Sequence, residues 1–545
     1  MAGMTRDLSR LTADRFDVLV VGGGIHGLFT AYDAAARGLR VALIDRGDFG
    51  SGISFNHQRT IHGGLRALQS MDLRKVREHI RERRAWARIA PHLLRPLPFM
   101  MGTYGTGKRS RLAMRAAFKL YDFIGRKRNA GVLPELHLPR TRLESATATR
   151  RFFPGIEAKG LSGGAVWYDY QTVHPDRLTW TVALAADRAG AALANYVEGL
   201  TPLREGQAIA GIRARDVMTG DEFDVRAKVV VLAAGSGLAS LQSRFGVAGA
   251  PPLILAMNLL LDRPGRDIAL AAPSAHGRML TAVPWGGGTL VGTYQPDGAV
   301  REDDGMTLEP VIEAFLAEVR TAFPGLDAKR EAVRFVHHGL VPGLPGSKGS
   351  DLLAESKVLS HPELPGVMSL VGVKYTTARL AAERAVDSVA RAVGATTRSC
   401  RTATQLLPHA DVADSDGLLQ ETSRGLGVRL ERDIQSHLAG WYGTEGPAVL
   451  RCAHAENALA RLTPERPVIA GEVIYAVRMA TATRLEDVVF RRTPLGSAGD
   501  PGGTALDNAA AIMARECGWS SERQTDEVTR VKKRFAPAKP ALTSP

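Results

Sequence analysis

Residues 16–27 read FDVLVVGGGIHG, and this stretch decides the fold. Its apolar first half is typical of a buried parallel strand, and the glycines that follow have the spacing GxGxxG. Gly22 permits a tight turn, Gly24 lets the backbone approach a pyrophosphate, and Gly27 lets the next helix pack closely on the strand. The pattern predicts the start of a nucleotide-binding α/β fold.

The next residues complete one βαβ unit. A helix is expected over 28–37, and a second apolar strand over 39–44 is followed by Asp45. The helix N-terminus favours anions, and Asp45 has the spacing of an acidic residue that binds a ribose hydroxyl. This context favours dinucleotide binding over a glycine-rich turn in an unrelated α/β protein.

Later features favour FAD over NAD as the dinucleotide. No third βαβ unit follows the second strand at once, because 51–64 is a Ser- and Gly-containing segment. A further buried strand ends only at Ala234 and Gly235, and Gly372 opens another turn before a late helix. A nucleotide domain interrupted by a substrate domain is typical of flavin oxidoreductases, so we expect FAD.

Composition indicates a globular protein of several domains. The chain has 545 residues, 45% hydrophobic and 23% charged. Its formal charge of +14 attracts phosphates, nucleic acid or anionic lipid, but no nucleic-acid-binding module is recognisable, so we expect no nucleic-acid partner. Three widely separated cysteines argue against a disulfide framework or a zinc site, so we expect a cytoplasmic protein without a metal.

The predicted architecture has three parts. Residues 1–395 form an α/β unit, a Rossmann-like FAD-binding domain with an inserted antiparallel-sheet substrate domain. We place the FAD-binding parts at about 16–85, 155–250 and 350–395, and the substrate parts at about 86–154 and 251–349. Polar helical segments after Gly394 predict a C-terminal α-helical domain over 396–520. The polar, proline-containing stretch 521–545 is predicted to be a mobile tail.

Several segments together resemble one flavoprotein family. They are 21–27 (VGGGIHG), 61–66 (IHGGLR), 76–95 (VREHIRERRAWARIAPHLLR), 120–125 (LYDFIG), 284–285 (PW), 291–293 (VGT), 374–377 (KYTT) and 483–496 (TRLEDVVFRRTPLG). Over about 16–497 the chain resembles the FAD-dependent glycerol-3-phosphate dehydrogenases, within the D-amino-acid oxidase-like flavoproteins. The resemblance implies hydride transfer from a secondary alcohol to flavin N5, with electrons passed on to quinone or oxygen.

The chain departs from the family pattern where the substrate phosphate is expected. Val341 stands in place of an Arg in a GxRP motif, and 354–355 (AE) stands near the place of a second family Arg. Ala67 replaces an aromatic residue, Asn258 replaces a His, and 55–59 (FNHQR) replaces a Ser-rich loop. A dianionic phosphate needs charge-assisted partners, best supplied by Arg. The substitutes that we consider are Arg59, Arg66, Lys348, Lys357 and Arg379.

Four residues are predicted to be catalytic. The resemblance implies that Lys374 stabilises negative charge on the reduced flavin, the alternative being a surface lysine at a helix N-terminus. Arg66 either binds an anionic substrate group or forms a salt bridge on its own helix. An alcohol hydroxyl needs a base, for which His337 and His338 are candidates, unless they bond to backbone. The expected cofactor-binding residues are Gly22, Gly24, Gly27, Asp45, Arg46, Ser51, His62, Gly63, Gly64, Ala234, Gly235, Gly372, Lys374 and Thr376.

One basic segment raises the question of a membrane. Residues 108–128 (KRSRLAMRAAFKLYDFIGRKR) hold eight basic residues and one acid, Asp122. A basic amphipathic helix fits an anionic bilayer interface, here the inner face of the cell membrane, or it packs on the substrate domain. Besides a small-molecule substrate and quinone or oxygen, the partners that we consider are therefore this membrane surface and a second copy in a homodimer.

Two other functions fit the same fold. An FAD-dependent amine or amino-acid oxidase would need a carboxylate site and an apolar pocket, and the HGGLR segment and Lys374 argue against it. A non-catalytic flavin-binding protein is supported only by the missing phosphate arginines.

Overall fold

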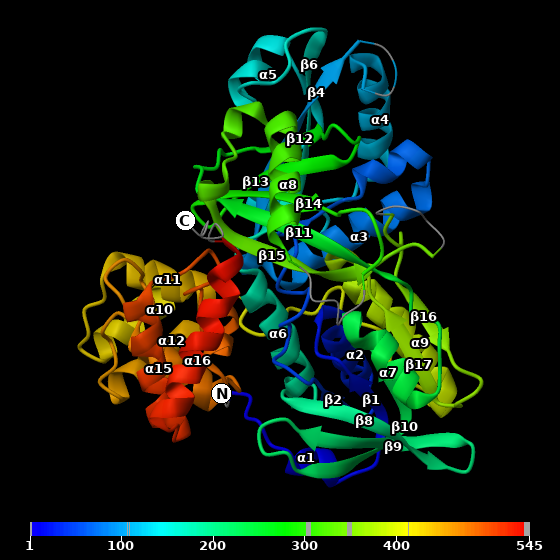
Figure 1. Cartoon of the computed structure of the whole chain (residues 1–545), viewed down its shortest axis with the longest axis vertical. Helices are drawn as coiled ribbons and strands as arrows, with labels where there is room; N and C mark the ends of the chain where they lie inside the picture. Colours follow the sequence, from blue (N-terminus) through cyan, green and yellow to red (C-terminus); the bar gives the residue numbers. More distant parts are fainter. Residues whose placement is uncertain are drawn as a thin grey trace.

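Two β-sheets organise the N-terminal part of the molecule, and a group of helices packs beside them (Figure 1). The computed structural model describes residues 3–105, 107, 109–300, 307–345, 351–411 and 414–538.

The first sheet is the predicted Rossmann-like sheet. Its strands in spatial order are β16 (Lys357–Ser360), β17 (Val367–Val371), β10 (Glu222–Leu232), β1 (Phe16–Val21), β2 (Val41–Ile44) and β7 (Ala192–Ala194). Neighbours along this path are parallel except β16 with β17. β1 is apolar almost throughout because both faces are covered: Val18 and Val20 join one core, and Leu19 and Val21 the other.

Helices cover one face of this sheet, and a hairpin with two further helices covers the other. The first face carries α2 (Ile25–Ala36), α6 (Pro175–Arg188) and α9 (Ala378–Val393). The other face carries α1 (Ser9–Thr12), α7 (Leu238–Phe245) and the hairpin of β8 (Val197–Glu205) and β9 (Ala208–Asp216). β10 is long enough to pair with β9 through its first half and with β1 through its second.

The second sheet is the predicted antiparallel substrate sheet. Its strands in spatial order are β15 (Val333–Pro342), β11 (Leu253–Leu261), β14 (Gly288–Tyr294), β13 (Met279–Trp285), β12 (Ala269–Pro273), β4 (Leu94–Tyr104), β6 (Leu161–Thr172) and β3 (Thr60–Ile61), with β5 (Arg142–Glu144) beside β6. The pairing of β12 with β4 is parallel. Further helices of this region are α3 (Leu73–Ile89), α4 (Arg111–Ile124), α5 (Ala146–Phe152) and α8 (Glu309–Ala322).

Strand β6 corrects one predicted boundary. The sequence pattern places 155–172 in the FAD-binding part, but β6 pairs with β4 and therefore belongs to the substrate sheet. The two-residue strand β3 also leaves the FAD-binding part to pair with β6. Such ladders join distant segments, and the local pattern of one strand does not reveal its partner.

The C-terminal part is built from helices, as expected. They are α10 (Ser415–Gly425), α11 (Arg432–Tyr442), α12 (Gly446–Ala455), α13 (Ala470–Met479), α14 (Leu485–Asp487), α15 (Gly503–Cys517) and α16 (Ser521–Phe535), with a π-helical turn at Val488–Arg492. This domain lies at the lower left of Figure 1, beside α6.

Helix α16 shows that the prediction of a mobile tail is wrong for 521–535. Ser520 caps the helix by accepting a hydrogen bond from the Arg523 amide. Val528, Val531 and Phe535 are buried in the C-terminal core. Their spacing of three and four residues forms an apolar stripe that the many surrounding charges conceal in the sequence. Residues 539–545 lie outside the described part of the chain.

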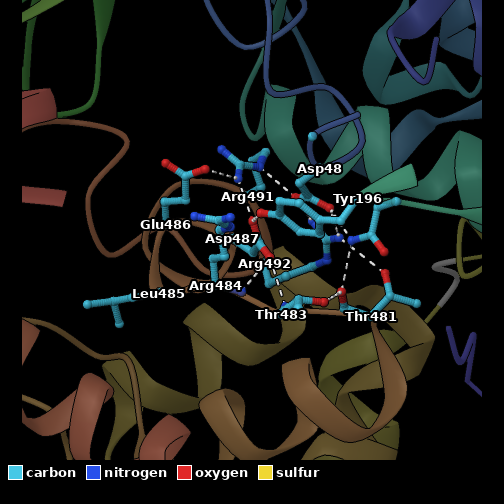
Figure 2. A network of polar contacts seen from close by, with 12 residues as sticks. Asp48, Tyr196, Thr481, Thr483, Arg484, Leu485, Glu486, Asp487, Arg491 and Arg492 are labelled. Atoms are coloured by element: carbon cyan, nitrogen blue, oxygen red, sulfur yellow. Dashed lines mark hydrogen bonds and ion pairs between the residues drawn. The ribbon is translucent and has the colours of Figure 1, made fainter. Parts of the chain in front are cut away.

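A buried charge network fixes the helical domain to the first sheet (Figure 2). Asp48, in the loop after β2, accepts hydrogen bonds from Arg491 Nε at 2.6 Å and Arg492 Nη2 at 2.7 Å. Arg491 also donates a hydrogen bond to Asp487. Asp487 accepts another from the hydroxyl group of Tyr196, a residue in the segment after β7. Burial opposes ionisation of Asp48, but Arg492 and Arg491 hold its pKa below the usual range.

We predict that this network contributes strongly to stability. Arg492→Gln removes one of the cations that compensate buried Asp48, so the free energy of unfolding should fall by about 3 kcal/mol in urea denaturation. Arg213→Gln is the control, since it breaks only exposed ion pairs at the β9–β10 hairpin and should leave the midpoint unchanged. Equal midpoints for the two variants would contradict the prediction.

Candidate active site

A cavity of about 900 Å³ runs from the β1–α2 turn to the end of β15. Residues of the Rossmann-like sheet, the substrate sheet and the C-terminal helices all contribute to its wall. The predicted residues that line it are Gly22, Gly24, Asp45, Arg46, Ser51, Ala234, Gly235, Gly372 and His338. Gly27 and the other predicted residues lie outside this lining.

The β1–α2 turn has the geometry that a pyrophosphate needs. Gly22 has φ +116°, and a Cβ there would lie 2.4 Å from the Ala233 carbonyl oxygen. A Cβ on Gly27 would lie 1.9 Å from the Gly22 carbonyl oxygen, so the close contact of helix and strand requires glycine. The N-terminus of α2 opens onto the cavity at Gly24, where backbone N–H groups and the helix dipole favour an anion.

Asp45 lies directly after β2, as predicted. Its carboxylate accepts hydrogen bonds from the backbone amides of Gly23 at 2.5 Å and Gly47 at 2.7 Å. Burial raises the pKa of Asp45 to about 6 despite these hydrogen bonds. The turn and this carboxylate therefore fit the pyrophosphate and a ribose of FAD.

The IHGGLR and KYTT segments meet each other, and of their residues Tyr375 alone is in the cavity lining. The His62 amide donates to Thr376 Oγ1 at 3.3 Å. A Cβ on Gly63 would lie 2.0 Å from the Tyr121 hydroxyl, so this glycine permits close packing. Gly64 has φ +72°, in the left-handed region that favours glycine.

Two predicted catalytic cations, Arg66 and Lys374, belong to these segments and lie outside the cavity wall. Lys374 is half-buried directly after Val373, which does line the cavity. Burial and nearby Lys75 lower the pKa of Lys374, although Glu355 opposes that shift. Arg66 is exposed on a short 3₁₀ helix, so the structure does not bring it into the cavity.

The two predicted bases have different surroundings, because neighbouring residues of a strand face opposite sides. His337 is fully buried outside the cavity wall, with its ring centroid 4.5 Å from that of Phe335. His338 lines the cavity and contacts Arg534 Nη1 through Nε2 at 3.0 Å. Burial, followed by Arg534, lowers the pKa of His338 to about 4, so this imidazole is neutral at pH 7.

The predicted phosphate-binding substitutes are engaged elsewhere. The Arg59 guanidinium is buried 4.7 Å from the Trp285 ring centroid and donates to the Phe55 carbonyl oxygen. Arg379 is paired with Glu82. Lys357 is exposed on edge strand β16, and Lys348 lies outside the described residues. None of the described substitutes lines the cavity.

Several lining residues escaped the sequence analysis. Asn56 and His57 belong to the loop that replaces the Ser-rich segment, and Tyr375 belongs to KYTT. Arg530 and Arg534 come from α16, and the signal that reveals them is the apolar stripe of that helix. Among the described residues, no group of three or more His, Cys, Asp or Glu side chains is arranged to hold a metal ion.

Comparison with known proteins agrees with this geometry. Residues 17–388 match the model of an FAD-dependent oxidoreductase family, and 393–524 match the C-terminal domain of alpha-glycerophosphate oxidase. A glycerol-3-phosphate dehydrogenase of Synechocystis is 30% identical over 96% of this chain and 97% of its own length. The chain belongs to the FAD-dependent glycerol-3-phosphate dehydrogenase family.

Other members of the family support this assignment. The mitochondrial glycerol-3-phosphate dehydrogenase of Mus musculus is 30% identical over 94% of this chain and 72% of its own length. The crystal structure of the glycerol-3-phosphate dehydrogenase from Bacillus halodurans, complexed with FAD, has the same fold, with a TM-score of 0.74. It is 24% identical and covers 99% of this chain and 98% of its own.

We predict that FAD binding depends on the ionisation of Asp45. The ribose hydroxyls donate to a carboxylate, so binding should weaken about tenfold per pH unit below pH 6, where the free protein protonates Asp45. Fluorescence titration of the apoprotein with FAD between pH 5 and 8 measures this dependence.

Two variants test the assignment to this carboxyl group. Asp45→Asn should weaken binding at pH 7.5 and remove the pH dependence between pH 5 and 6. Asp17→Asn should leave both unchanged, because Asp17 lies outside the cavity lining. Identical pH profiles for the wild type and Asp45→Asn would rule out the role of Asp45.

Proposed function

We propose that this chain is an FAD-dependent dehydrogenase that oxidises a small secondary alcohol, glycerol-3-phosphate or a related polyol phosphate or hydroxy acid. The proposed electron acceptor is quinone or oxygen. The observation that carries the proposal is the single cavity that joins the dinucleotide turn at Gly22 to the substrate sheet at His338. The names of the relatives support the same class of substrate.

The proposed chemistry divides between the cofactor and the chain. Bound FAD would supply the acceptor of the hydride, which brings two electrons to N5. The N-terminus of α2 and Asp45 hold the cofactor, and neutral His338 accepts the proton of the alcohol hydroxyl. Arg534 donates to Nε2 of His338, so Nε2 carries the lone pair and is the atom that would take this proton once Arg534 releases it. Lys374 acts through its charge from beside the cavity.

An anaerobic reduction experiment tests the function. Protein reconstituted with FAD should lose its long-wavelength flavin absorption when glycerol-3-phosphate is added without oxygen. Reduction by amino acids alone would support an amino-acid oxidase instead. A flavin that no small alcohol or amine reduces would support a non-catalytic flavin-binding protein and end the proposal.

The role of His338 has its own prediction. His338→Ala should slow flavin reduction at least about tenfold, since a positioned base contributes this much or more. His337→Ala should slow it less, because His337 is sealed behind the cavity wall. A His338→Ala enzyme as fast as the wild type would exclude His338 as the base.

We further propose that helix α4 attaches the protein to an anionic membrane surface. Leu112 and Phe123 are 76% and 67% exposed on this helix, at the edge of the molecule away from the helical domain (Figure 1). Arg115, Lys119 and Arg126 are exposed around them, while Lys108 lies outside the described residues. Apolar side chains with flanking cations fit a lipid interface.

Among the described helices, none has both the length and the apolar character to cross a membrane. The homodimer stays a prediction.

Co-sedimentation with anionic liposomes tests this surface. The double variant Leu112→Glu/Phe123→Glu should bind at least about tenfold more weakly, because it removes two apolar anchors and adds negative charge. Leu418→Glu is the control, since Leu418 is also exposed but lies on α10. Wild-type protein that stays in the supernatant at low salt would exclude membrane attachment through α4.

A further inference from the structure

Helix α16 presents two arginines to the cavity from outside both sheets. Arg530 and Arg534 line the cavity and are four positions apart, so they lie on one face of the helix. Val531 and Phe535 are buried, and the Phe535 ring centroid is 5.7 Å from that of Phe335 on β15. This packing holds the arginine-bearing face in place against the substrate sheet.

Arg534 reaches the substrate end of the cavity. Its Nη1 donates to His338 Nε2 at 3.0 Å, and its Nη2 donates to Asn56 Oδ1 at 2.9 Å. The guanidinium carbon lies 5.6 Å from the Phe335 ring centroid. A guanidinium has five N–H donors and no acceptor, so further donors remain for a ligand.

The charge of Arg534 lacks a carboxylate partner. In the described part of the chain, no Asp or Glu oxygen lies within ion-pair distance of Arg530 or Arg534, whereas Arg379 and Arg492 are paired with buried carboxylates. Burial lowers the pKa of Arg534 to about 10, which leaves it charged at pH 7. A half-buried cation without an ion-pair partner is unfavourable, and an anionic ligand would compensate it.

The position of Arg534 favours the substrate over the cofactor as the source of that anion. The N-terminus of α2 already faces the expected pyrophosphate at Gly24. Arg534 instead contacts a residue of β15, and Val341 on the same strand contributes an apolar side chain to the lining. The cations at this end of the cavity therefore come from α16.

We propose that Arg534, assisted by Arg530, binds the phosphate group of the substrate. The proposal rests on the proposed function and makes Arg534 a specificity-determining residue. Two guanidinium groups suit a dianionic phosphate, because each can donate more than one hydrogen bond to it.

Calorimetric titration of the FAD-loaded protein with inorganic phosphate tests the binding site without turnover. Arg534→Gln should weaken phosphate binding by about 30-fold or more, and Arg534→Lys by less. Lys533→Gln is the matched control, since Lys533 is exposed on the same helix and should bind phosphate as the wild type does. FAD affinity and the urea midpoint should be unchanged in all three variants.

Kinetics separate this proposal from the proposed function. Arg534→Gln should raise KM for sn-glycerol-3-phosphate by a similar factor, and by much more than it raises KM for glycerol, which lacks the phosphate. Phosphate binding that depends on Arg534 in a protein that oxidises neither alcohol would support the phosphate site and refute the proposed function.

Three results would overturn the phosphate site. One is wild-type protein that does not bind phosphate. Another is an Arg534→Gln variant that binds phosphate as tightly as the wild type. The third is an Arg534→Gln variant that loses FAD affinity and keeps its affinity for phosphate, which would assign the guanidinium to the cofactor.

Discussion

A carboxylate that stays ionised when buried needs compensating charge or hydrogen bonds, and Asp48 imposes this requirement where the first sheet meets the helical domain. Arg491 and Arg492 meet it from a segment more than four hundred positions later in the chain. Asp48 lies in the loop that starts at Asp45, so the same contacts hold the loop along the cofactor cavity. The helical domain therefore helps to position a loop that lines the cavity.

The arginines of this basic chain fall into groups with different consequences. Arg379, Arg491 and Arg492 are paired with carboxylates and hold elements together. Arg59 is buried among aromatic rings and a carbonyl oxygen. Arg534 donates hydrogen bonds to neutral side chains and lines the cavity. The net charge of +14 does not reveal these differences, because they depend on what lies within a few ångströms of each guanidinium.

Local features of the sequence predicted the cofactor half of the site. The roles of Gly22, Gly24 and Asp45 follow from steric and hydrogen-bonding rules that act over a few residues, and the structure places all three in the cavity lining. The same is true of the parallel sheet, whose apolar strands have both faces covered.

The substrate half depended on contacts that no local pattern contains. His337 and His338 are adjacent in sequence, and only the register of β15 decides which one faces the cavity. The packing of α16 decides that Arg534 lines the end of the cavity where Val341 stands in place of an expected Arg. The assignment of Lys374 and Arg66 came from family resemblance, and the structure leaves both outside the cavity lining.

Helix α16, near the end of the described residues, completes one wall of the cavity. Other parts of the lining, Val21 and Gly22, come from the end of β1 and the turn after it. Closing a contact between such distant segments has a large entropic cost and is slow compared with forming local structure. During synthesis, the dinucleotide turn emerges long before α16, so we expect FAD to be captured by an open, incomplete site. Docking of α16 then adds Arg530 and Arg534 to one side of this site, so the chemical character of the cavity wall is completed last.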